Sequence, residues 1–336
     1  MIHVRKLGRS GLSVSEIGFG AWGIGGSTPG ATSYGRTEDR VSLRAIDEAL
    51  AQGINFFDTS NVYGFGHSEE LLGQALQSRR DRAVVATKAG LVRYGEPLDF
   101  SPAEIRRSLE GSLRRLKFDH VDVLQLHTPP VERMSAGTDL RELAAQLKKG
   151  GLIRAFGISV RAPADGFCAL EQLAPDVIQT NFNLLDQRAI DCGLLDATAA
   201  AGCAVIARTP LCFGFLGGSV DENTNFPDDD HRSRWPREQI AWWVRGAKAM
   251  LKLAEPGQSA GQFALRFCLS FPAVTSVIPG ILTAQEAVEN AAASTLGPLP
   301  PATLEAVRRV YAGLGEPLAK PADPGKMDRP AANAPA

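Results

Sequence analysis

The sequence predicts an α/β protein, a (β/α)8 TIM barrel, on three observations. Short apolar runs alternate with helical patterns along most of the 336 residues. Between about residues 16 and 293 this alternation gives eight strand–helix units, the number that closes such a barrel. The GxGxxG spacing at residues 18–23 does not open a helix, so the fingerprint of the competing doubly wound fold is missing. Length alone suggests two domains, but barrels of this class often exceed about 250 residues as one domain.

Eight apolar or β-branched runs are the predicted strands. Short continuous runs of this kind are typical of parallel strands that are buried on both faces. They cover residues 16–19, 54–57, 83–87, 121–126, 153–158, 177–179, 203–207 and 274–278. Residues 4–14, with Gly8 and Ser10-Gly11 at a turn, are predicted to form a β-hairpin that caps the bottom of the barrel.

The clearest helix is predicted over residues 101–116. Ser101 is placed to cap it, Pro102 suits the first helical position, and Glu104 would complete a capping box. Extra helices are predicted after the seventh strand, over residues 237–253 and 259–270, and again toward the C-terminus. The second of these opens with a capping box at Ser259 and Gln262.

The predicted domain boundaries follow from composition. Residues 1–315 are expected to form a single barrel domain, and residues 316–336 form a Pro/Ala-rich tail expected to have little structure of its own. Residues 217–235 form a long polar loop after the seventh strand, and loops of this length are usually functional lids or disordered.

Charge and cysteine content exclude several classes of protein. The chain has 36 Lys and Arg against 37 Asp and Glu, which argues against a nucleic-acid binder. No apolar stretch approaches the roughly 18 residues of a membrane helix, and residues 1–6 lack the apolar region of a signal peptide. The five cysteines are scattered and odd in number, which predicts reduced thiols in a cytoplasmic protein without a metal site.

Four polar residues follow successive predicted strands. Asp58 and Tyr63 come after the second strand, Lys88 after the third and His127 after the fourth. Each residue type alone is common in a turn or at a strand end. In a barrel of this kind, however, the C-terminal ends of the strands meet at one mouth and form the active site. The four together therefore predict a catalytic centre.

These side chains suit proton transfer to a carbonyl oxygen. A phenol has a pKa of about 10 and is a poor acid at neutral pH. Lys88 beside Tyr63 is expected to lower the phenol pKa, and Asp58 would keep Lys88 charged and in position. His127 could polarise or orient a bound carbonyl oxygen.

The chain resembles the aldo-keto reductase superfamily, in its bacterial form, from about Lys6 to Ala293. The most specific element is Asp-Thr-x-x-x-Tyr-Gly at residues 58–64, with Lys88 and His127 downstream. The other segments that carry the resemblance are 18–23, 56–57, 87–88, 125–127, 157–159, Gln179, 209–211 and 278–290.

The resemblance implies an oxidoreductase that reduces an aldehyde or ketone to an alcohol, or the reverse, with a nicotinamide cofactor. It makes Tyr63 the general acid, with Lys88, Asp58 and His127 supporting it. It implies NADP(H) as the default cofactor and a small carbonyl or sugar as substrate. The substrate residues implied are Trp22, Tyr34, Tyr63 and His127. The cofactor residues implied are Ala21, Trp22, Asp58, Ser159, Gln179, Arg208, Thr209, Pro210, Leu211, Gly214, Gly280, Leu282, Glu286, Glu289 and Asn290.

The chain departs from the family pattern at three places. Val160 stands where the family usually has Asn, so one carboxamide hydrogen bond is either absent or supplied by Asn181. Arg208 replaces an aromatic residue, and its guanidinium could stack on nicotinamide or bind an anion. Leu282 and Glu286 stand where NADP-preferring members carry a cation or hydroxyl, which leaves NAD(H) possible. Glu286 also completes a capping box with Thr283.

Two other functions remain open from the residues alone. Lys88 could form a Schiff base in a barrel lyase, which requires a depressed lysine pKa, whereas Asp58 would raise it. A non-catalytic nicotinamide-binding regulatory subunit is the other alternative, although all four catalytic positions are filled.

Residues 25–34, 91–100 and 217–235 are expected to shape the substrate pocket. The chain has only four tyrosines and four tryptophans, so an aromatic-rich pocket is not expected. The oligomeric state is left open.

Overall fold

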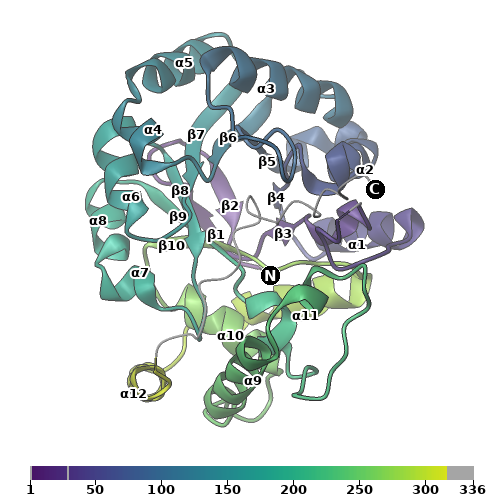
Figure 1. Ribbon diagram of the computed structural model, residues 1–336, viewed down its shortest axis with the longest axis vertical. Helices are drawn as coiled ribbons and strands as arrows, with labels where there is room; N and C mark the ends of the chain where they lie inside the picture. Colours follow the sequence, from purple (N-terminus) through teal and green to yellow (C-terminus); the bar gives the residue numbers. More distant parts are fainter. Residues whose placement is uncertain (1, 29, 316–336) are drawn as a thin grey trace, which may run out of the picture.

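Eight parallel strands form a barrel in the computed structural model, which describes residues 2–28 and 30–315 (Figure 1). Hydrogen-bonded neighbours follow the chain order from β3 to β10. Parallel bridges from Ile17 to Val277 and from Gly20 to Gly280 close the two ends of the sheet onto each other. The strands are β3 (Phe19–Gly20), β4 (Phe56–Asp58), β5 (Val84–Ala89), β6 (Val121–His127), β7 (Ile153–Ser159), β8 (Val177–Asn181), β9 (Ala204–Arg208) and β10 (Val274–Ile278). The predicted barrel is confirmed.

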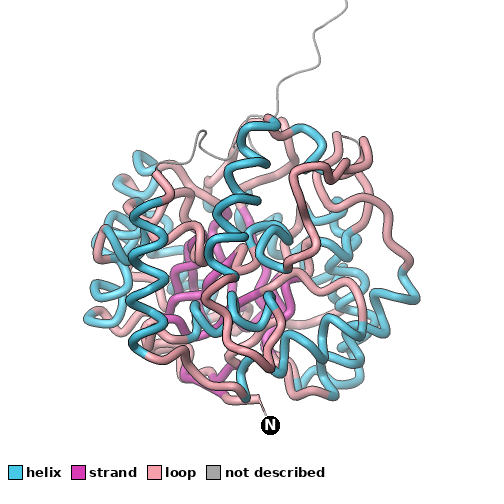
Figure 2. The backbone as a smooth tube through the Cα atoms, turned by 90° about the horizontal axis from the view of Figure 1, so that it is seen from below, coloured by secondary structure: helices cyan, strands magenta, loops and turns pink. Residues whose placement is uncertain are grey.

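Helices surround the strands on all sides, as Figure 2 shows. The ring contains α1 (Asp39–Ala51), α2 (His67–Leu76), α3 (Pro102–Leu116), α4 (Val131–Ser135), α5 (Thr138–Lys149), α6 (Asp165–Cys168), α7 (Arg188–Asp191), α8 (Leu194–Ala200), α10 (Ala260–Leu269) and α11 (Ala284–Thr295). The two extra helices are α9 (Arg237–Leu251), before the last strand, and α12 (Pro301–Gly313), after the ring. Within the described part of the chain, no helix has the length and apolar character needed to cross a lipid bilayer.

The N-terminal hairpin closes the bottom of the barrel, as expected. Strand β1 (Val4–Lys6) pairs antiparallel with β2 (Ser13–Ser15). Leu7, Leu12 and Val14 are buried against the inward-facing side chains of the barrel strands. Those inward residues are Phe56, Val84, Ala86, Val123, Ala155, Val177, Ala204, Ile206 and Ile278.

Several strands run further toward the mouth of the barrel than predicted. The prediction ended the third strand at residue 87 and the fourth at 126, whereas Lys88 and His127 lie inside β5 and β6. Asp58 is likewise the last residue of β4. The difference arises because the apolar run ends at the first polar residue, whereas the hydrogen-bonded pairing of the strands continues through the polar residues. The backbones of Asp58, Lys88 and His127 are therefore fixed by strand hydrogen bonds rather than by loops.

Two helix predictions needed correction. Ser101 caps α3 by accepting from the Glu104 N–H at 3.3 Å, but Glu104 turns to Ser108 and Arg107 and does not complete the box. Helix α9 ends at Leu251, two residues before the predicted end. The box at Ser259 and Gln262 is present. The predicted tail, residues 316–336, lies outside the described residues.

A glycine fixes the closest approach of two helices of the ring. A Cβ atom on Gly73 of α2 would lie 2.6 Å from the Leu116 carbonyl oxygen of α3.

We expect Gly73→Ala to lower the free energy of unfolding by about 1–3 kcal/mol, because neither backbone can give way without repacking. Urea unfolding measures the change. Gly313→Ala, in α12 with open space around it, is the matched control and should leave stability unchanged or raise it slightly. Equal stability of the two variants would contradict this account of the α2–α3 contact.

Candidate active site

The inward face of the strands changes from apolar to polar toward the mouth of the barrel. Side chains alternate along a strand, so every second residue faces the interior. In β4 the inward residue after Phe56 is Asp58, and in β5 the inward residue after Ala86 is Lys88. In β6 the residue after inward Val123 is Gln125. The same alternation that fills the apolar bottom layers thus delivers the polar residues to one layer at the mouth.

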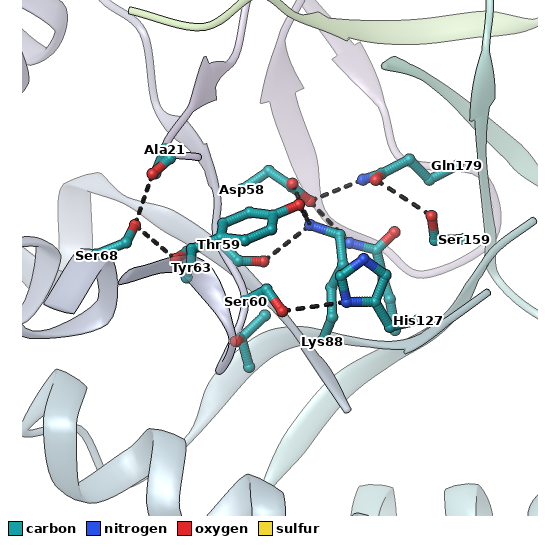
Figure 3. A network of polar contacts seen from close by, with 12 residues as sticks. Ala21, Asp58, Thr59, Ser60, Tyr63, Ser68, Lys88, His127, Ser159 and Gln179 are labelled. Atoms are coloured by element: carbon teal, nitrogen blue, oxygen red, sulfur yellow. Dashed lines mark hydrogen bonds and ion pairs between the residues drawn. The ribbon is translucent and has the colours of Figure 1, made fainter. Parts of the chain in front are cut away.

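Lys88 and Asp58 form a buried ion pair at the centre of this layer (Figure 3). The Lys88 Nζ lies 2.5 Å from Asp58 Oδ1, and the two side chains are 1% and 3% exposed. The ammonium also donates to the Thr59 carbonyl oxygen at 2.8 Å and to the Tyr63 hydroxyl at 3.2 Å. Its three protons therefore have three acceptors, which is what an ammonium needs in order to be buried.

The second oxygen of Asp58 is held by two amides. Gln125 and Gln179 each donate from Nε2 to Asp58 Oδ2 at 2.8 Å. Ser159 lies beside them, with its hydroxyl 3.5 Å from Gln179 Oε1. Gln125 was not predicted as a site residue, although its inward position two residues before His127 is a signal that could have revealed it. The carboxylate is thus fixed from three strands other than its own: β5, β6 and β8.

Tyr63 reaches the pair from a turn after β4, the 3-10 helix Tyr63–Gly66. A Cβ atom on Gly64 would lie 2.3 Å from the Gly25 carbonyl oxygen, so glycine is required where this turn meets the loop after β3. Burial raises the pKa of Tyr63 well above its usual range, Asp58 raises it further, and Arg208 opposes both. The prediction that the phenol pKa is lowered is therefore wrong for the protein alone: Tyr63 holds its proton at neutral pH.

His127 lies across the site from Tyr63, with the two rings edge to face and their centroids 6.1 Å apart. Its Nδ1 lies 3.2 Å from the Ser60 hydroxyl, which also lies 3.0 Å from Asn61 Oδ1. Burial, with added repulsion from Lys88 and Arg208, holds the pKa of His127 well below its usual range. The imidazole is therefore neutral at pH 7. Ser60 either donates to Asn61 and accepts from a protonated Nδ1, or donates to an unprotonated Nδ1.

Burial also lowers the pKa of Lys88, and the Asp58 carboxylate opposes the decrease. The expected upward effect of Asp58 is present, but the net direction is downward. A depressed pKa alone does not make the lysine a nucleophile, because its nitrogen is engaged with Asp58, Thr59 and Tyr63. The contacts favour a charged, positioned ammonium over a Schiff-base lysine.

Arg208, at the end of β9, directs its guanidinium into the same region. Its Nη2 donates to the Val160 carbonyl oxygen at 3.1 Å. Its buried Nε has no hydrogen-bond partner among residues 2–28 and 30–315. Two of the three departures from the family pattern are thus in contact: Val160 supplies no side-chain donor, but its backbone carbonyl holds the Arg208 guanidinium.

The segment that follows Arg208 is anchored to β8 and the loop after it. Thr209 has a left-handed backbone, with φ of 53°, and its hydroxyl donates to Asn181 Oδ1 at 2.7 Å. Asn183 donates to the Thr209 carbonyl oxygen at 2.9 Å. Because the oxygen of Asn181 is engaged, only its amide nitrogen could replace the missing family residue. Pro210, Leu211 and Gly214 follow in this anchored turn.

The last of the predicted cofactor residues, from Gly280 to Asn290, begin beside the closing edge of the barrel. Gly280 forms a parallel β-bridge with Gly20. Ala21, which follows Gly20, donates its N–H to the Asp58 carbonyl oxygen at 2.9 Å. The cofactor residues predicted near α11 therefore lie on the same mouth as the catalytic four. Among these, Glu289 is half-buried and Asn290 is buried.

Helix α11 begins with the predicted capping box. Glu286 Oε2 accepts from the N–H groups of Leu282 at 2.6 Å and Thr283 at 3.0 Å. The Thr283 hydroxyl accepts from the Glu286 N–H at 3.2 Å. The side chains of the helix start therefore already satisfy these three donors.

Aromatic side chains gather above Tyr63, contrary to expectation. The ring centroid of Trp22 lies 6.5 Å from that of Tyr63 and 5.1 Å from that of Tyr34. His231, from the loop after β9, lies 4.8 Å from Trp22 and 5.0 Å from Tyr34. Burial raises the pKa of Tyr94, and the neighbouring Trp22 indole opposes this rise. Counting residue types could not predict this wall, because its members converge from separate loops.

Comparison with known proteins agrees with this geometry. Residues 16–312 match the model of the Aldo/keto reductase family. The chain is 32% identical to aldo-keto reductase YhdN of Bacillus subtilis, over 78% of this chain and 80% of that protein. It is 30% identical to the NADH-specific methylglyoxal reductase of Escherichia coli, over 85% and 92%. The structure of glycerol dehydrogenase AKR11B4 from Gluconobacter oxydans superposes with a TM-score of 0.76 at 32% identity, covering 93% and 95%.

The chain therefore belongs to the aldo/keto reductase family. It is an oxidoreductase that interconverts a carbonyl group and an alcohol with a nicotinamide cofactor. The lyase and the non-catalytic regulatory subunit are not favoured.

The ion pair gives a stability prediction. Asp58→Asn removes the charge that compensates Lys88 in a buried position, so we expect the free energy of unfolding to fall by about 3–5 kcal/mol. Urea unfolding measures the loss. The control is Asp47→Asn, which breaks the partly exposed ion pair of Asp47 with Arg79 and should cost no more than about 0.5 kcal/mol. A loss at Asp58 as small as the loss at Asp47 would show that the central pair does not stabilise the barrel.

Proposed function

We propose that this enzyme reduces a small aldehyde or ketone, with Tyr63 as the proton donor to the carbonyl oxygen. The single observation that supports this role is the contact of its hydroxyl with Lys88, 3.2 Å away at the mouth of the barrel. A bound nicotinamide would supply hydride to the carbonyl carbon. Tyr63, which burial keeps protonated, gives its proton to the developing alkoxide.

Lys88 acts on the state that follows proton transfer. Once Tyr63 has lost its proton, the phenolate oxygen lies within hydrogen-bond reach of a fixed ammonium. The charge-assisted bond that forms then is stronger than the neutral bond before it, so the contact stabilises the product side of the transfer. Asp58 keeps the ammonium in place and limits the cost of burying it.

His127 orients the carbonyl oxygen if its Nε2 carries the proton. That tautomer requires Ser60 to donate to His127 Nδ1 rather than to Asn61. A neutral imidazole suits this role, since a second cation beside Lys88 and Arg208 would be strongly disfavoured. Ser60 is therefore proposed as the residue that sets the His127 tautomer.

The residues at the mouth fit a nicotinamide group. The hydroxyl of Ser159 and the amide oxygen of Gln179 are separated by a long 3.5 Å contact, so both can turn to a carboxamide. The buried Arg208 Nε and Gln125 Oε1 lack partners in the described ranges, and a polar planar ligand could satisfy them. We propose Ser159 and Gln179 for the carboxamide and Arg208 for the ring face.

The start of α11 supports NAD(H) over the NADP(H) that the resemblance implied. A 2′-phosphate at this helix start would compete with Glu286 for the N–H groups of Leu282 and Thr283 and meet its negative charge. A 2′-hydroxyl could instead donate to the carboxylate. Leu282 offers no side-chain donor to a phosphate.

The cytoplasmic location stays a prediction. All five cysteines are free thiols, and burial raises the pKa of Cys203 to about 12. A buried thiol of this kind is poorly reactive. The unpaired state of all five is what a reducing compartment would maintain.

Replacement of Tyr63 tests the proton donor. Tyr63→Phe should lower kcat for aldehyde reduction by about 100-fold or more, while the fluorescence-monitored Kd for the reduced cofactor changes little. Tyr311→Phe, on α12, is the matched control and should behave as the parent enzyme. Turnover close to that of the parent in Tyr63→Phe would rule out the proposed role.

Parallel titration with NADH and NADPH tests the cofactor. We expect the parent enzyme to bind NADH more tightly. Glu286→Gln should shift the ratio of the two Kd values toward NADPH by about tenfold, because glutamine can keep the cap but removes the charge. Glu305→Gln, on α12, should leave the ratio unchanged. Binding of NADPH at least about tenfold tighter than NADH by the parent enzyme would overturn the NAD(H) assignment.

A further inference from the structure

The loop after β9 is fastened to the loop after β3 across the mouth of the barrel. The backbone N–H of His231 donates to the Ser33 carbonyl oxygen at 2.8 Å. The backbone of Asp230 forms isolated β-bridges with Ser33 and Tyr34. The Arg232 guanidinium lies over the Tyr34 ring at 4.9 Å and is also paired with Asp230. These contacts fix the position of His231 relative to the site below it.

The hydrogen bonds of His231 define which of its nitrogens is an acceptor. Nδ1 lies 3.1 Å from the Ser33 carbonyl oxygen, which can only accept, so Nδ1 carries the proton. Nε2 then carries a lone pair. Burial lowers the pKa of His231 to about 4, against the opposing effect of Asp230, so the ring is neutral at pH 7. The imidazole therefore presents a hydrogen-bond acceptor at Nε2.

That acceptor is buried and unused within the described part of the protein. His231 Nε2 has no hydrogen-bond partner among the residues described, and the same is true of the buried Ser33 hydroxyl. Buried polar atoms are nearly always hydrogen-bonded, so a partner from outside the chain is the natural complement. Two such atoms in adjacent loops, in residues that contact each other, point to a polar ligand.

His231 belongs to the wall that faces the proton donor. Its ring packs on Trp22, at 4.8 Å, and Trp22 in turn lies 6.5 Å from Tyr63. A group that reaches His231 Nε2 while its carbonyl lies at Tyr63 must belong to the body of the substrate. A neutral acceptor selects a hydrogen-bond donor.

We propose that His231 is a specificity-determining residue whose Nε2 accepts a hydrogen bond from a substrate hydroxyl. The enzyme then selects hydroxylated aldehydes and ketones over unsubstituted ones of the same size. This assignment rests on the proposed reduction at Tyr63. A site built to bond a hydroxyl discriminates strongly against the analogue that lacks it, because the buried acceptor is left unpaired.

The test compares glyceraldehyde with propanal, which has the same carbon chain without hydroxyls. The parent enzyme should show a kcat/KM for glyceraldehyde at least about tenfold above that for propanal. His231→Phe keeps a planar ring but removes the acceptor, and should reduce this ratio about tenfold or more. His231→Gln can place an amide oxygen near the position of Nε2 and should retain part of the ratio.

His120→Phe, in the loop before β6 at the opposite end of the barrel, is the control and should leave the ratio unchanged. A ratio in His231→Phe within about twofold of the parent value would overturn the proposal. So would a parent enzyme without preference for glyceraldehyde, a result that does not depend on any variant folding. Failure of the proposed function is distinguishable, because neither aldehyde would then be reduced or Tyr63→Phe would remain active.

Discussion

The buried ion pair between Asp58 and Lys88 is the interaction on which the rest of the site depends. Two charges this deeply buried are tolerated only when nearly every lone pair and proton has a partner. Those partners come from three segments: Thr59 and Tyr63 after β4, Gln125 from β6 and Gln179 from β8. Only a closed barrel brings these strand ends to one point, so the charge pair and the fold require each other.

The interior of the barrel separates this polar centre from the apolar core, because the two occupy different layers. The bottom of the interior is apolar and is sealed by Leu7, Leu12 and Val14 of the hairpin. The top layer uses the same inward positions of the same strands for charged and amide side chains. Because the layers share strand hydrogen bonds, Asp58, Lys88 and Gln125 are held by the same strands as the core below them, whereas Tyr63 is presented from a turn.

The sequence predicted what is periodic or carried by a motif. The eight strands, the hairpin and the positions of Asp58, Lys88 and His127 followed from apolar runs and what comes after them, although these residues proved to lie within the strands. Gln125 was missed because a polar residue inside an apolar run was counted as part of the strand. His231 could not be predicted: it meets Ser33 across 198 residues of sequence, through a loop without periodicity. Contacts between irregular loops depend on the folded barrel that spaces their ends.

The direction of the pKa shift at Tyr63 changes how the site is understood. The sequence suggested an ammonium that pre-ionises the phenol, but Asp58 lies closer to that ammonium than the phenol does, at 2.5 Å against 3.2 Å. Burial raises the pKa of Tyr63, and the Asp58 carboxylate raises it further. Tyr63 therefore stores a proton rather than releasing it to solvent. In the proposed reduction, the field of Lys88 becomes useful only when the alkoxide takes the proton and the phenol ionises, so the stabilisation grows as the transfer proceeds and is smallest in the resting enzyme.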